Sequence, residues 1–244
     1  MITQYFQFLK GYSPFSTGLR LLPVALSVGA ASIFGTKLAV RLGNKTVVSA
    51  GLASMGIAFL WISTASVATH YLELACQMIV LGVGMGFTSA PATEAIMGVV
   101  PKEKAGIGSA INDTTRELGG TLGVAVIGSV FASIYTARLA LPQGLPSEAA
   151  HAARESVGGA FIAAQRVADA GLGSAAAQLK DAASHAFFDG FAIGCLVAAG
   201  VALVGAVIAA VLLPAYPVLD VTDEATDTLE SDPDLKLAPV APLA

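Results

Sequence analysis

The sequence predicts an all-α membrane protein with five transmembrane helices. Hydrophobic residues make up 55% of the 244 residues, charged residues only 12%, and the mean hydropathy is +0.73, a balance outside the usual range of soluble globular domains. Several stretches lack charged side chains for the roughly 20 residues that a helix needs to cross a bilayer. No segments alternate with period two over ten residues, so a transmembrane β-barrel is excluded.

Five segments meet this length criterion, and each is expected to form one span: residues 18–40, 46–69, 74–93, 118–137 and 190–213. The expected organisation follows from them. Residues 1–17 form the end of a truncated preceding helix and an outer loop, and residues 18–138 form a four-helix transmembrane segment. Residues 139–186 form an outer loop, residues 187–214 the last transmembrane helix, and residues 215–244 a disordered acidic tail.

The basic residues between the spans predict an orientation. Lys37, Arg41 and Lys45 follow the first span, Lys102 and Lys104 follow the third, and the connection after the second span has neither Lys nor Arg. Because Lys and Arg stay preferentially on the cytoplasmic side, these two connections and the acidic tail are expected inside an inner (plasma) membrane. The alternation is incomplete, since other basic residues then lie outside.

The outer loop is alanine-rich and too charged to cross lipid. Val157, Phe161 and Ala164 recur at helical spacing, and Ser174 is placed to cap a second short helix. Two short amphipathic helices are therefore expected, which pack over the mouth of the bundle or lie in the membrane interface.

Small residues four apart predict the faces on which membrane helices pack, because they let backbones approach closely. Three of the predicted spans carry such rows. The positions assigned to helix packing are Gly82, Gly86, Gly119, Gly120, Gly123, Gly190 and Gly194.

A polar cluster precedes the fourth span. Asn112, Asp113, Arg116 and Glu117 share an arc of about 160° with the glycines that follow, at about 100° per residue. Asp113 is spaced to neutralise Arg116 on the same helix. A face of this kind is expected to look into protein or water.

Two interpretations of this cluster stay open. In one, residues 118–137 are the whole span, and the charges are interfacial anchors in the headgroup zone. In the other, the helix starts near Pro101 and carries the cluster into a water-filled cavity, where ionisable residues serve an ion or substrate pathway. The second interpretation makes Asp113 and Glu117 candidates for proton exchange. Glu94, which follows Pro91, is either a further candidate or an interfacial carboxylate.

Other chemistry is not indicated. The two cysteines fall within predicted spans and the three histidines are scattered, so no metal site, disulfide framework or cofactor is expected. No catalytic triad, GxSxG, HExxH or phosphate loop occurs, so an enzyme is not expected. The net charge of −4, much of it in the tail, gives no basis for a nucleic-acid partner.

Three stretches resemble consecutive blocks of the fourteen-span drug:proton antiporter family of the major facilitator superfamily. They are GYSPFSTGLRLLP from Gly11, LGVGMGFTSAPATEAIMGVVP from Leu81 and GIGSAINDTTRELGGTLGVAVIGSVF from Gly106. The family's loop signature is matched by Arg41, Gly43 and Lys45, while Val40 stands where that signature has an acid.

The resemblance implies a C-terminal fragment that holds spans ten to fourteen of a proton-coupled multidrug efflux transporter working by alternating access. The implied partners are the bilayer, protons, small amphipathic or cationic drugs and the missing N-terminal half, without which no transport is expected. A competing interpretation is a non-transporting scaffold or assembly module derived from a split transporter gene.

Overall fold

The computed structural model describes residues 1–98 and 100–213, and all its regular elements are helical. The sequence prediction of an all-α protein with five candidate spans is confirmed: Pro14–Leu42, Asn44–Ile62, Tyr71–Met97, Ala105–Arg138 and Gly173–Leu212 are long and apolar enough to cross a membrane. The expected acidic tail, residues 215–244, lies outside the described residues.

The first two spans are joined by a sharp reversal. A short helical stretch, α1 (Ile2–Gln4) and the π-helical turn η1 (Tyr5–Leu9), precedes α2 (Pro14–Arg20), which Ser13 caps by accepting a hydrogen bond from the Ser16 amide at 3.2 Å. Helix α3 (Leu22–Leu42) follows and ends at Gly43, whose φ of 83° and ψ of 148° suit glycine almost alone. Because that conformation turns the chain back, α4 (Asn44–Ile62) begins at the next residue.

Helix α5 (Tyr71–Met97) lies between α3 and α4 and packs on both through glycines. A Cβ built on Gly86 would lie 2.6 Å from the Ala31 Cβ of α3, and one on Gly84 would lie 2.7 Å from the Gly51 carbonyl oxygen of α4. Such contacts exist only because the small residues let the backbones touch. Gly82 likewise meets Ser27 of α3.

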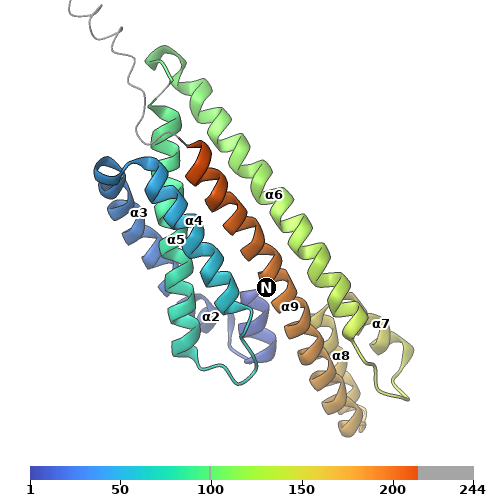
Figure 1. Cartoon of the computed structure of the whole chain (residues 1–244). Coiled ribbons are helices and arrows are strands. Elements are labelled where there is room, and N and C mark those ends of the chain that lie inside the picture. Colours follow the sequence, from blue (N-terminus) through green and yellow to red (C-terminus); the bar gives the residue numbers. More distant parts are fainter. Residues whose placement is uncertain (99, 214–244) are drawn as a thin grey trace, which may run out of the picture.

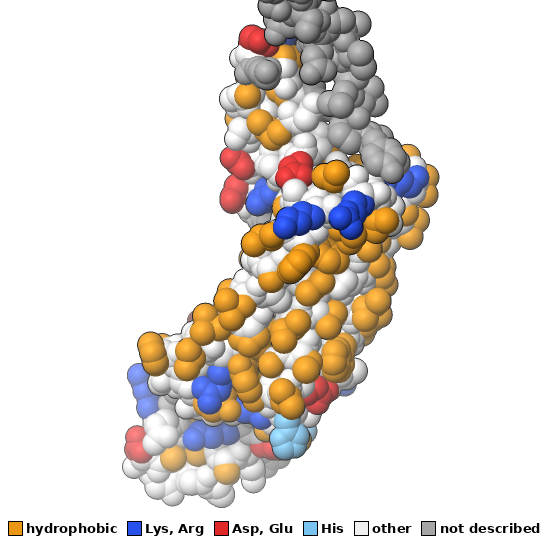
Figure 2. Space-filling view, turned by 90° about the vertical axis from the view of Figure 1, so that its left-hand side faces the viewer, with side chains coloured by type: hydrophobic (Ala, Val, Ile, Leu, Met, Phe, Trp, Pro, Cys, Tyr) orange, Lys and Arg blue, Asp and Glu red, His pale blue; other side chains and the backbone are white. Residues whose placement is uncertain are grey.

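The remaining long helices extend this bundle sideways. Helix α9 (Gly173–Leu212) packs on α4. Helix α6 (Ala105–Arg138) packs on α9, where Gly190 faces Phe131. Helices α3 and α6 therefore form the two edges of the bundle in Figure 1. A belt of hydrophobic side chains covers the face in Figure 2, with Lys and Arg side chains gathered at its two borders. Such a belt with charged borders is typical of a membrane-spanning surface.

The segment that follows α6 forms a small helical layer, which we call the cap: α7 (Ser147–Glu155), α8 (Val157–Asp169) and the first turns of α9. Alanines fill its core; Ala153, Ala160 and Ala164 are all fully buried. The cap is held to the bundle by the Tyr135 hydroxyl of α6, which donates to the Ala153 carbonyl oxygen at 2.9 Å.

Three boundaries differ from the sequence prediction. The expected second short helix, capped by Ser174, is the beginning of α9, so the expected boundary at residue 187 falls inside one 40-residue helix. Hydropathy alone predicts a boundary at residue 187, but no proline or capping residue interrupts the alanine-rich part of α9. The second span ends at Ile62 because the next residues form a turn in which the Ser66 amide donates to Thr69 Oγ1 at 2.8 Å. The fourth begins at Ala105 instead of residue 118.

Candidate functional site

The polar cluster lies on the first half of α6, within one unbroken helix. The 3₁₀ turn η2 (Lys102–Lys104) leads into α6, which begins at Ala105 and runs to Arg138. Asp113 is therefore about two turns inside the helix. The helix starts close to Pro101, as the longer-helix interpretation expects.

This part of α6 has almost no neighbours in the described chain. Asp113, Arg116 and Glu117 are exposed, and Asn112 is half-buried. Cβ atoms built on Gly119, Gly120 or Gly123 would meet nothing within 4 Å among the described residues, whereas Gly190 and Gly194 of α9 touch the second half of α6. We call residues 112–123 the open segment of α6.

One side-chain hydrogen bond ties the open segment to the bundle. The Arg116 Nη2 donates to Thr93 Oγ1 of α5 at 3.2 Å, and Thr93 Oγ1 also lies 3.0 Å from the Ser89 carbonyl oxygen, to which it donates. No sequence pattern singles out Thr93, although it lies next to the candidate Glu94. Glu94 is exposed one residue further along α5.

The expected local pairing of Arg116 with Asp113 is absent from the described residues. The ion pairs found there are Arg138–Asp189, His151–Glu155, Arg166–Glu148 and His185–Asp181, all on α6's far end, the cap or α9. The reason is geometric, because the long guanidinium reaches across to α5. Asp113 and Glu117 are consequently left without a salt-bridged cation in this part of the chain.

The helix register gives the level of the cluster along the bundle. Gly190 of α9 faces Phe131 and Gly194 faces Ile127, so each step along α6 is one step back along antiparallel α9. If both helices keep the same rise per residue, Arg116 lies level with Gly205 of α9. Gly205 lies about 10 Å before Leu212, where α9 ends. Its backbone is thus level with the apolar end of α9.

Thr93, which accepts the hydrogen bond from Arg116, lies closer to the end of the bundle at which α3 ends. Phe87 of α5 lies against Gly35 of the parallel helix α3, so Thr93, six residues further on, is level with Arg41. The guanidinium therefore reaches from an apolar level toward the charged end of α3. Glu117, one residue further from the start of α6, is the deepest charged group of the cluster.

The loop-signature residues surround the α3–α4 reversal. Gly43 supplies the backbone conformation that the reversal needs, while Arg41 and Val40 are exposed. No ion pair within the described ranges includes Arg41 or Lys45. Residues 1–98 and 100–213 also contain no group of three or more His, Cys, Asp and Glu arranged to hold a metal ion.

The fold and this cluster define a class: a multi-span α-helical membrane protein with charged side chains on one edge helix. Residues 1–124 match the family model described as Major Facilitator Superfamily. The chain belongs to that superfamily.

Its relatives are named for drug efflux and drug resistance. The chain is 32% identical over 210 residues to the multidrug efflux pump LfrA of Mycolicibacterium smegmatis, which covers 86% of this chain and 41% of LfrA. It is 31% identical over 187 residues to the methyl viologen resistance protein SmvA of Salmonella typhimurium, 77% of this chain and 37% of SmvA. The multidrug resistance protein Stp of Mycobacterium tuberculosis is 32% identical over 142 residues, 57% of this chain and 26% of Stp. The chain thus spans about two fifths of the length of the first two relatives.

Proposed function

We propose that this chain is the C-terminal part of a proton-coupled multidrug efflux transporter of the inner membrane, with its C-terminal tail in the cytoplasm. The partner is a second, N-terminal half, and the cargo is a small amphipathic or cationic drug exchanged for protons. In alternating access, two halves rock about a central site. The chain on its own is then inactive, because no opposing half closes the other gate.

The open segment of α6 is the observation that carries this proposal. A helix that presents Asp113, Arg116, Glu117 and three bare glycines to open space needs a partner surface or water there. Gly82, Gly84 and Gly86 of α5 lie close to neighbouring helices, whereas the open segment lies on α6 at one edge of the bundle. That edge is where a second half would meet this one.

The contact with Thr93 separates the role of Arg116 from the role of the two carboxylates. By accepting from Arg116 at 3.2 Å, Thr93 holds the guanidinium toward the end of the bundle and away from Asp113 and Glu117. The two carboxylates then exchange protons, while Arg116 and Asn112 serve the pathway as fixed polar groups. Glu94, next to Thr93, is the third carboxylate of the proposed pathway.

The test is co-expression of this chain with an N-terminal half in cells that lack their own efflux pumps. Efflux of methyl viologen and of a fluorescent cationic dye is measured between pH 6 and pH 8. We expect D113N and E117Q each to lower the proton-driven rate at least about tenfold, the scale typical of an essential proton-transfer group. E94Q should act in the same direction.

Two variants serve as matched controls. E148Q and D181N remove exposed carboxylates of the cap and α9, and they should leave efflux within about twofold. Unchanged pH-dependent efflux in D113N and E117Q would remove these residues from the proton path. Stable assembly of the two chains without efflux of either probe would favour a scaffold over a transporter.

A further inference from the structure

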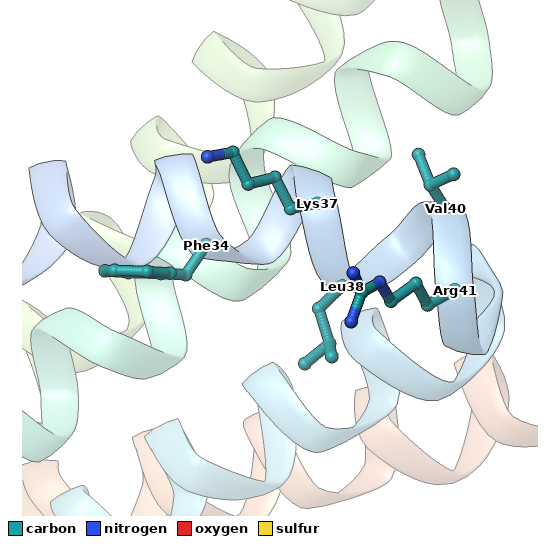
Figure 3. A pocket seen from close by; sticks show the side chains of 5 residues that line it. All are labelled: Phe34, Lys37, Leu38, Val40 and Arg41. Carbon is teal, nitrogen blue, oxygen red and sulfur yellow. The ribbon is translucent and has the colours of Figure 1, made fainter.

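A second polar feature lies at the other edge of the bundle, on the face of α3 that points away from α5. Lys37 and Arg41 are exposed and one turn apart. Together with Phe34, Leu38 and Val40 they line an open groove of about 620 Å³. Figure 3 shows that all five side chains come from α3, with Arg41 extending toward Leu38.

The two cations have no protein counterion in the described part of the chain. None of the ion pairs found there involves Lys37 or Arg41, and neither side chain donates a hydrogen bond to another described residue. By contrast, Arg20 at the opposite end of this span lies 3.9 Å from the centre of the Tyr12 ring. The groove therefore presents two positive charges, one turn apart on α3, that no described residue neutralises.

The rest of the groove is apolar. Phe34 is 65% exposed and Val40 76% exposed, while the opposite side of α3 is buried through Ala31, Gly35 and Ala39. Lys and Arg side chains border the hydrophobic belt in Figure 2. A ligand that fits this groove must carry a negative head and an apolar body, side by side.

We propose that this groove binds an anionic phospholipid of the membrane leaflet at the α3–α4 end. The Lys37 ammonium and the Arg41 guanidinium attract the phosphate, and an acyl chain lies along Phe34 and Leu38. Basic residues next to a transmembrane helix attract anionic lipids, and the exposed aromatic ring adds an apolar contact that a free phosphate does not use. This site is independent of the proposed transport function.

The experiment measures lipid retention on the purified chain in detergent by native mass spectrometry. Phosphatidylglycerol and phosphatidylcholine with identical acyl chains are titrated in parallel. We expect preferential retention of phosphatidylglycerol, and K37Q/R41Q should weaken it about tenfold or more, since each cation near the surface contributes severalfold. The matched control K45Q/K104Q removes the same charge at the same end and should change retention less than about twofold.

Two further arms separate a lipid from a free anion. F34A should weaken phosphatidylglycerol retention about threefold or more through lost apolar contact, and inorganic phosphate at millimolar concentration should not displace the lipid. The proposal is overturned if phosphatidylcholine is retained equally, or if K45Q/K104Q acts as strongly as K37Q/R41Q. Displacement by inorganic phosphate, or loss of retention when an N-terminal half covers the groove, would overturn it too.

Discussion

The two halves of α6 differ in how much of their packing this chain supplies. The second half meets α9 at Gly190 and Gly194 and reaches the cap through Tyr135. The open segment, residues 112–123, has bare glycines and one hydrogen bond to α5. The same residue type thus occurs in two settings, since glycine lies against a neighbouring helix in one half and faces open space in the other.

The largest expected effect comes from filling a packed glycine of α5 and, for comparison, a bare glycine of the open segment. G86L places a side chain where even a Cβ would lie 2.6 Å from Ala31 and 2.7 Å from the Val28 carbonyl oxygen, so it should cost at least about 3 kcal/mol or prevent folding. G119L meets nothing within 4 Å among the described residues and should leave the unfolding midpoint in detergent unchanged. Equal destabilisation by the two substitutions would contradict the comparison.

A smaller destabilisation is expected at the reversal between α3 and α4, where the backbone conformation requires glycine. G43A forces an L side chain into φ 83° and ψ 148°, which costs about 1–3 kcal/mol. The expected result is a lower midpoint of thermal unfolding. G106A, in the first turn of α6 where nothing lies within 4 Å, is the control and should be neutral or slightly stabilising.

A still smaller destabilisation is expected at the contact between the second half of α6 and the cap. Y135F removes the 2.9 Å hydrogen bond to the Ala153 carbonyl oxygen and leaves a buried acceptor, so unfolding should become easier by about 1 kcal/mol. Y12F is the comparison, because the Tyr12 hydroxyl donates no hydrogen bond within the described residues. An identical response in both variants would argue against a cap held by Tyr135.

The smallest effect concerns the hydrogen bond that joins the open segment to α5. T93V removes the acceptor of Arg116, and we expect the co-expressed transporter to lose about threefold in efflux rate, a change of under about 1 kcal/mol. The pH profile of efflux should also move, because the guanidinium becomes free to approach Asp113 and Glu117. T115V changes a threonine that bonds only its own helix, at the Ile111 carbonyl oxygen, and should leave the profile in place.

The sequence was sufficient for the number of spans and for much of the packing. Charge-free length identified all five helices, and the spacing of Gly82, Gly86, Gly190 and Gly194 marked positions that do touch a neighbouring helix. Gly51, Gly56 and Gly84 were missed, although each faces another helix closely. They belong to no predicted row of small residues, so only the helix register brings them into contact.

The candidate site was only partly predictable. The sequence left two starts open for the fourth helix, and the structure has the one near Pro101, at Ala105, while the partner of Arg116 was not predicted. Local spacing favoured Asp113, whereas the length of an arginine side chain allowed Thr93 on another helix. Pairings across helices depend on tilt and register, which a single sequence does not encode in its spacing.

One continuous helix joins the cap to the last span, since α9 runs from Gly173 to Leu212, about 60 Å, without interruption. Any change in the tilt of the span must therefore move the cap together with it. A spectroscopic label on the exposed residue His185 would report motions of the apolar half of α9 without a probe in that half.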